Sequence, residues 1–111
     1  MKIIRIVLII IFLGEGLTKL LGLQFQVDAF ANWGYTMQFM YLIGGLETLS
    51  AIGLMLKPLR LYASIGLLCV MVGALYTHLS RNDPPQMMLL AVIATILLSV
   101  HIYRLTKKKT V

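Results

Sequence analysis

Four long apolar segments, each bounded by turn or helix-breaking residues, constrain most strongly how this chain can fold. They lie at about residues 3–23, 37–56, 61–80 and 86–104. Each is about as long as the ~20-residue helix that crosses the hydrocarbon core of a bilayer. Pro58 closes the second segment, and the sequence RNDPP (81–85) closes the third. The pattern predicts an all-α integral membrane protein, a four-helix bundle that forms one domain over residues 1–111.

The composition excludes a soluble globular domain. Hydrophobic residues make up 59% of the 111 residues and charged residues 13%, against about 45–50% and about 25% in soluble domains. The mean hydropathy is +0.90. A soluble domain of this size would still expose about a third of its surface, which so apolar a chain cannot do in water. The lipid bilayer is therefore the expected surrounding.

The net charge of +6 is explained by membrane topology rather than by binding of nucleic acid. Six of the ten basic residues lie near the two ends of the chain: Lys2, Arg5, Arg104, Lys107, Lys108 and Lys109. With four spans, the 57–60 link lies on the same face as both termini, and that face carries eight of the ten. Because basic residues concentrate on the cytoplasmic face, we expect both termini to be cytoplasmic in a bacterial-type inner membrane, and no nucleic-acid partner.

The first connection, residues 24–36, is the longest and mixes aromatic with polar residues. This composition favours an interfacial segment, with Trp33 and Tyr35 at the level of the lipid headgroups. The same segment could instead cover a cavity between the helices. The sequence leaves both alternatives open.

Three charged residues lie within the apolar segments. Helical rise places Glu15 and Glu47 near mid-bilayer, Lys19 one turn above Glu15, and His78 near the outer boundary. A charge at the centre of a spanning helix opposes insertion by roughly 2.5–3.5 kcal/mol, so these side chains should face the interior. Either Lys19 bridges both glutamates, or one glutamate is neutral.

These residues form the candidate site, a buried polar site for a ligand or for protons. It consists of Glu15, Lys19, Glu47 and His78, with possible lining by Thr18, Trp33, Tyr41 and Thr77. The same charges could instead serve only to fix the register of the helices. No His/Cys cluster has the spacing of metal ligands and no nucleophile motif occurs, so neither a metal nor catalytic residues are assigned.

Three smaller predictions follow from single residues and small-residue spacing. His101 is expected near the membrane interface, and Cys69 is expected to be a small packing residue in the core. Small residues recur on two segments, which predicts close helix approach or a dimer seam: Gly14, Thr18 and Gly22 on the first, and Gly66 and Gly73 on the third.

Several motifs resemble the DoxX-like family of small four-helix membrane proteins. They are FLGEGLTKLLG (12–22), WGY (33–35), YLIGGLETLSAIGLML (41–56) and LRLYASIGLLCVMVGALYTHLSRNDPP (59–85). The G-x-x-K of the family is matched by Gly16 and Lys19, its second-segment glutamate by Glu47, and its third-segment histidine by His78. Glu15 departs from the pattern, because many relatives carry a small residue there.

The resemblance implies an accessory or assembly component of a membrane redox complex, since relatives are linked to such complexes or to assembly of other membrane proteins. Two alternatives stay open. In one, the chain is a quinone-binding subunit in which Lys19 or His78 donates to a quinone carbonyl and Glu47 relays a proton. In the other, it is a proton-coupled carrier of a small solute. Quinone is the only cofactor implied, the expected partner is a membrane protein or a second copy, and activity as an enzyme by itself is not expected.

Overall fold

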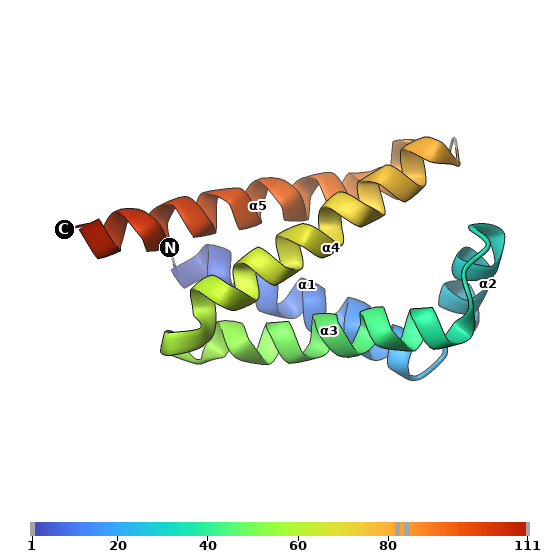
Figure 1. Ribbon diagram of the computed structural model, residues 1–111, viewed down its shortest axis with the longest axis horizontal. Helices are drawn as coiled ribbons and strands as arrows, with labels where there is room; N and C mark the ends of the chain where they lie inside the picture. Colours follow the sequence, from blue (N-terminus) through green and yellow to red (C-terminus); the bar gives the residue numbers. More distant parts are fainter. Residues whose placement is uncertain (1, 82, 84, 111) are drawn as a thin grey trace.

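The computed structural model describes residues 2–81, 83 and 85–110, and the side chains of residues 2–81, 83 and 88–107. Helices are the only regular elements in this part of the chain (Figure 1). They are α1 (Lys2–Leu20), α2 (Gln24–Asn32), α3 (Met37–Met55), the 3₁₀ turn η1 (Lys57–Leu59), α4 (Arg60–Ser80) and α5 (Pro85–Thr110).

The bounds of three predicted segments agree closely with the helices. The segments at 37–56 and 61–80 correspond to α3 and α4. The fourth begins as expected, but α5 continues past residue 104 to Thr110, so the start of the basic tail is helical. Of the predicted breaker at 81–85, Asn82 and Pro84 lie outside the described residues.

The first predicted segment is shorter than expected, and a second helix follows it. α1 ends at Leu20, and Gly22 has a φ of 65°, a left-handed conformation that glycine adopts without a Cβ clash. The chain then enters α2, whose axis is turned by 83° from that of α1. The connection at 24–36 therefore contains a helix of its own instead of continuing the first segment.

Among the residues that the structure describes, three helical segments are long and apolar enough to span a membrane: Met37–Met55, Lys57–Ser80 and Met88–Lys107. A fourth span is obtained only if α1 and α2 are counted together as one bent span. The chain is thus a helical membrane protein with three spans, or up to four on that count.

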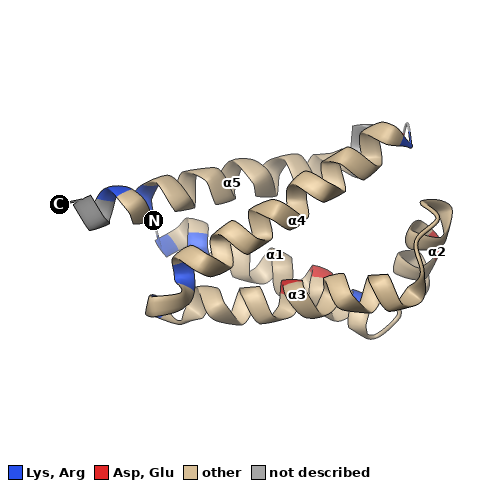
Figure 2. Ribbon diagram, viewed as in Figure 1, with Lys and Arg blue, Asp and Glu red and all other residues tan. Residues whose placement is uncertain are grey.

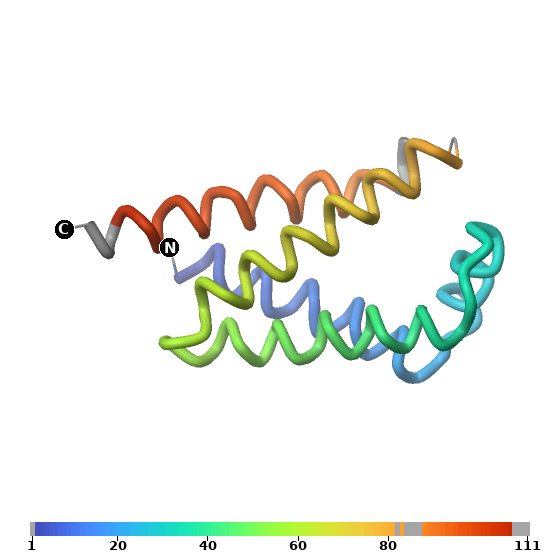
Figure 3. The backbone as a smooth tube through the Cα atoms, in the orientation of Figure 1, coloured from blue at the N-terminus to red at the C-terminus, as the bar shows by residue number. Residues whose placement is uncertain are grey.

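The long helices are arranged as two pairs, α1 with α3 and α4 with α5 (Figure 1). The pairs meet near the end where both termini lie and diverge toward the end where α2 lies, as the backbone trace also shows (Figure 3). Basic residues gather at the end that carries the termini, whereas Glu15 and Glu47 lie along α1 and α3 (Figure 2). This separation leaves the α2 end with few basic residues.

A contiguous apolar core joins the two pairs. Its buried members are Leu8, Phe12, Ala51, Leu54, Leu67, Met71, Ala91, Ala94 and Leu98. Within the first pair, α1 and α3 approach most closely at Gly16 and Gly44, where an added Cβ on Gly44 would lie 2.9 Å from the Gly16 carbonyl oxygen. Close approach of helices in membranes depends on such small residues.

The glycines singled out from the sequence are not the ones at this crossing. An added Cβ on Gly14 or Gly73 would meet nothing within 4 Å, and Gly22 serves the turn after α1. Within one chain the close approach uses the face of α1 that carries Gly16 and Lys19, and the predicted alternative of a dimer seam at Gly14 stays a prediction.

Candidate functional site

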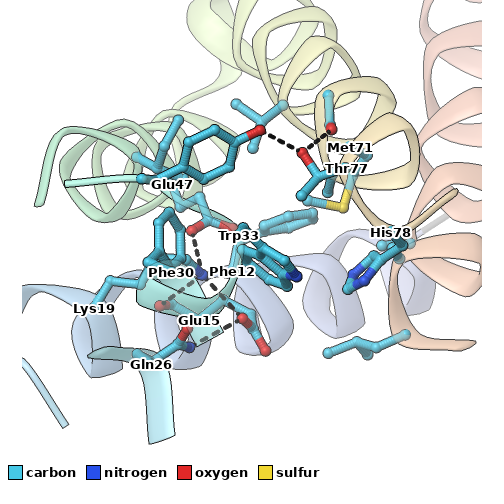
Figure 4. Close-up of a pocket in the computed structure, with 18 of the residues that line it drawn as sticks. Phe12, Glu15, Lys19, Gln26, Phe30, Trp33, Glu47, Met71, Thr77 and His78 are labelled. Carbon is cyan, nitrogen blue, oxygen red and sulfur yellow. Dashed lines mark hydrogen bonds and ion pairs between the residues drawn. The ribbon is translucent and has the colours of Figure 1, made fainter. Parts of the chain in front are cut away.

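A cavity of about 620 Å³ lies between the two helix pairs, at the end of the molecule where α2 lies. Most of its lining is apolar or aromatic, with a small number of polar side chains (Figure 4). The polar lining residues are Glu15, Lys19, Gln26, Trp33, Tyr35, Glu47, Thr77 and His78, together with the exposed Cys69 and Tyr76. Apolar cavities with few polar groups are typical of small-molecule sites.

One wall carries an ionic cluster of Glu15, Lys19 and Glu47, called here the Glu–Lys–Glu cluster. Lys19 Nζ lies 3.0 Å from Glu15 Oε2 and 2.9 Å from Glu47 Oε1. Lys19 is only 6% exposed and Glu47 only 1%. The geometry is that of the first predicted alternative, in which one lysine bridges two carboxylates. The contact with Glu47 is chiefly ionic, because Oε1 accepts no well-aligned hydrogen bond.

The helices position this cluster through spacing and small residues. Glu15 and Lys19 are four residues apart on α1 and so lie on one face. Gly44 of α3 leaves room for the Lys19 side chain, because an added Cβ would lie 2.7 Å from Lys19 Cβ. Glu47 follows Gly44 by three residues, so it lies on the same face of α3 and meets the lysine across the crossing.

Gln26 joins α2 to the cluster, a role that was not predicted from the sequence. Its Nε2 donates to Thr18 Oγ1 at 2.9 Å and, more weakly, to Glu15 Oε2 at 3.4 Å. Thr18 in turn donates to the Glu15 carbonyl at 3.0 Å. Gln26 is buried whereas the neighbouring Gln24 is exposed. The only available signal was a glutamine amid apolar residues in a segment thought to be interfacial.

The opposite side of the cavity carries a second polar group, built around Asp83. Asp83 Oδ2 accepts from His78 Nδ1 at 2.7 Å and from Trp33 Nε1 at 2.9 Å. The hydrogen bond from His78 holds the pKa of the Asp83 carboxyl below its usual value. Asp83 lies after α4 and was not among the predicted site residues. His78 is thus separate from the Glu–Lys–Glu cluster, although both line one cavity (Figure 4).

Residues 24–35, called here the lid segment, cover the cavity. Phe30, Trp33 and Tyr35 all line it, and Phe30 packs edge-on against Trp33 with ring centroids 5.2 Å apart. The Tyr35 hydroxyl lies 2.8 Å from Thr77 Oγ1 on α4, which adds a second polar link beside the Trp33–Asp83 bond. The sequence left open whether this segment lies in the membrane interface or covers a cavity. The structure supports the second alternative, and a position in the membrane interface stays a prediction.

The sequence was compared with protein families, curated proteins and solved structures. A sequence model of the DoxX-like family matches residues 3–100. The chain belongs to the DoxX-like family. No curated protein and no solved structure matches it. The match spans α1 to α4 and most of α5, so the whole cavity of this DoxX-like protein lies within the family region.

The remaining predicted residues of the DoxX-like protein are placed as follows. Trp33 and Thr77 are among the residues that line the cavity. Thr18 does not, because Gln26 binds its hydroxyl, and Tyr41 lies on an exposed part of α3 with its ring near Gly22. Cys69 is exposed and borders the cavity, so its assignment to the core was wrong.

His101 lies inside the protein, between α5 and α4, and its expected depth near the membrane interface stays a prediction. The side chain is fully buried, and Nδ1 lies 2.8 Å from Ser64 Oγ. The Ser64 hydroxyl donates to the Arg60 carbonyl at 2.8 Å, so it accepts the hydrogen of Nδ1. His101 thus links α5 to α4 at the end that carries the termini, remote from the cavity.

Proposed function

We propose that this DoxX-like protein binds a quinone-class ring in the lid-covered cavity and acts as an accessory subunit of a membrane redox complex. The observation that carries the proposal is the cavity itself. Its volume of about 620 Å³ falls within the ~300–1,000 Å³ of typical ligand pockets. Its apolar lining suits a ligand that reaches it from lipid.

The arrangement of side chains fits a flat ring with a polar atom at each end. The Glu–Lys–Glu cluster lies on one side of the cavity and His78 on the other, with the ring of Trp33 between them (Figure 4). Phe30 and Tyr35 add further aromatic faces. Aromatic side chains pack favourably against a flat ring, and the two polar groups would fix its orientation.

The accessory role follows from the chemistry of a quinone couple, which exchanges two electrons and two protons. The lining residues can hold and orient the ring and accept protons, but the electrons must come from another redox group. We propose that a partner membrane protein supplies them. The basic residues at the end that carries the termini (Figure 2) favour a bacterial-type inner membrane with both termini cytoplasmic.

The test is binding of a short-chain benzoquinone to the purified protein in detergent, followed by isothermal titration calorimetry and thermal unfolding. We expect saturable binding and a raised melting temperature. Ala74→Phe fills the cavity and should abolish both effects, because Ala74 lines it. Ala31→Phe is the matched control, since Ala31 is exposed on α2. Absence of binding of both the benzoquinone and its hydroquinone to the unaltered protein would refute the proposal and favour a purely structural Glu–Lys–Glu cluster.

A proton-coupled carrier is the weaker candidate. Such a carrier needs a carboxylate that exchanges its proton for the solute, whereas Glu15 and Glu47 both contact Lys19. Uptake of a small solute into proteoliposomes that is lost in Glu47→Gln would support the carrier instead.

A further inference from the structure

The polar lining residues differ sharply in how many of their hydrogen-bond donors and acceptors are engaged. On the Glu–Lys–Glu side, the donors are used. Lys19 Nζ, with three N–H groups, contacts three oxygens: Glu15 Oε2, Glu47 Oε1 and, at 3.4 Å, the Glu15 carbonyl. Both N–H groups of Gln26 have acceptors, on Thr18 and Glu15. The Lys19 ammonium is thus held by hydrogen bonds to Glu15 and by its ionic contact with Glu47, and both N–H groups of Gln26 have acceptors.

The donors on the opposite side are used as well. Trp33 Nε1 and His78 Nδ1 both donate to Asp83. Thr77 donates to the Gly73 carbonyl at 2.9 Å, so it accepts the hydrogen of the Tyr35 hydroxyl. Every donor on the buried and half-buried polar lining residues is thus engaged within the protein.

Acceptors, in contrast, remain open. Glu15 Oε1 and Glu47 Oε2 accept no hydrogen bond from any described residue. His78 Nδ1 carries the hydrogen given to Asp83, so in the neutral form of the ring Nε2 is an acceptor, and no described residue donates to it; a protonated ring would instead form an ion pair with Asp83 and donate at Nε2. Open acceptors thus occur on both sides of the cavity.

Two exposed lining residues retain donors but do not alter this balance. The thiol of Cys69 is a weak donor. Tyr76 has a hydroxyl, but its side chain is 71% exposed and so lies mostly outside the cavity.

We propose that the cavity selects the reduced form of its ring ligand, a hydroquinone, over the oxidised quinone. The inference rests on the proposed function and names the form of the ligand that the site takes. A hydroquinone has two O–H donors, which match open acceptors on the two sides. A quinone has only acceptor oxygens, which would face carboxylate and imidazole acceptors with no donor available. Sites that leave buried polar groups unpaired discriminate strongly against the wrong analogue.

This proposal reverses the roles expected from the sequence. Lys19 is not a donor to a quinone carbonyl, because its N–H groups hold the two glutamates in place. Its role is to orient carboxylates that accept from the ligand. His78 likewise accepts at Nε2, with Asp83 fixing the tautomer.

The test compares three probes of one shape: a short-chain benzoquinone, its hydroquinone kept reduced under argon, and the dimethyl ether of that hydroquinone, which has no O–H. Dissociation constants come from isothermal titration calorimetry on the full chain in detergent. We expect the hydroquinone to bind at least about tenfold more tightly than either other probe. The bound couple should then have a midpoint potential raised by about 30 mV, the equivalent of tenfold for two electrons.

The other outcomes separate the two proposals. Equal affinity for quinone and hydroquinone, or tighter binding of the quinone, overturns this inference and leaves the proposed function standing. Tight binding of the dimethyl ether also overturns it, because shape alone would then decide affinity. Failure of all three probes to bind overturns both proposals.

Matched variants test whether the lining acceptors set the preference. Glu15→Gln replaces an acceptor oxygen by an amide that can donate, and should reduce the hydroquinone-to-quinone affinity ratio several-fold. Glu15 is 32% exposed in its side chain, so the variant should fold. Asp28→Asn makes the same chemical change on the exposed face of α2 and should leave the ratio unchanged. If Glu15→Gln and His78→Phe both fold and both keep the ratio, the inference fails.

Discussion

Replacing Lys19 by methionine tests whether the Glu–Lys–Glu cluster is a buried ionic centre, because methionine keeps most of the side-chain volume and removes the charge. Glu47 is the partner that loses most, since its buried carboxylate has no contact with another cation among the described residues. Removing one member of a buried pair costs about 3–5 kcal/mol. Glu15 is one-third exposed, so its pair contributes only about 0–1 kcal/mol. We therefore expect Lys19→Met to lower the free energy of unfolding by about 3–5 kcal/mol.

A second substitution shows which carboxylate is responsible for the loss. Adding Glu47→Leu to Lys19→Met should restore most of the stability, because it removes the stranded charge from the interior. Adding Glu15→Leu instead should restore little, since Glu15 can reach water. The coupling energy of Lys19 with Glu47 should thus exceed that with Glu15 by about 2 kcal/mol or more.

The free energies can be measured by reversible unfolding in mixed micelles, with sodium dodecyl sulfate as denaturant and far-ultraviolet circular dichroism as the signal. Double-mutant cycles then give the two coupling energies. A loss below about 1 kcal/mol for Lys19→Met, the level of an exposed pair, would show that water screens the cluster. Equal coupling to both glutamates would refute the difference in burial on which the prediction rests.

Three further predictions concern the helix crossing and the lid segment. Gly44→Ala should lower the free energy of unfolding by about 1–3 kcal/mol, because the added methyl group would lie 2.9 Å from a backbone oxygen of α1. Gly14→Ala is the control in the same unfolding assay. It should be neutral or slightly stabilising, because its methyl group would meet nothing within 4 Å. The hydrogen-bonded Asp83 carboxylate has a lowered pKa, so its contribution to lid closure should be present above the ordinary pKa of 3.8 and be lost at lower pH. Fluorescence of Trp33, the single tryptophan, should report that loss on acidification, and Asp83→Asn should remove the pH dependence. Tyr35→Phe deletes the hydroxyl bonded to α4 and should cost about 0.5–1.5 kcal/mol of unfolding free energy; no loss would show that this bond does not hold the lid segment.

The depth of each charged residue along its apolar helix was the property of the sequence that best predicted the candidate site. Counting residues from the helix ends placed Glu15, Lys19 and Glu47 near one level, and the structure brings these three together. The count works because helical rise is fixed and because charges in lipid must face the interior. It also placed His78 higher along its helix; that this histidine lies on the opposite side of the cavity is a finding of the structure.

The parts that could not be predicted depend on tertiary contacts. The bend at Gly22 interrupts an apolar run, and hydropathy does not distinguish a straight helix from a bent one. Gln26 and Asp83 lie in connecting segments, where polar residues are ordinary, and their roles arise only from partners on other helices. The contact of His101 with Ser64 likewise depends on the rotation of α5, which the position of the histidine in the sequence does not give.

The crossing at Gly16 and Gly44 has a consequence for how the cavity can change its width. The backbones of α1 and α3 are in contact there, immediately beside Lys19, so this pair has no room to rearrange. The α4–α5 pair packs against α1 and α3 through the apolar core, and at the α2 end it is linked to the lid segment by two side-chain hydrogen bonds. We therefore expect a change in the width of the cavity to displace α4 and α5 more than the α1–α3 pair. In that case the wall that carries the Glu–Lys–Glu cluster would stay in place, and the wall that carries His78 would move.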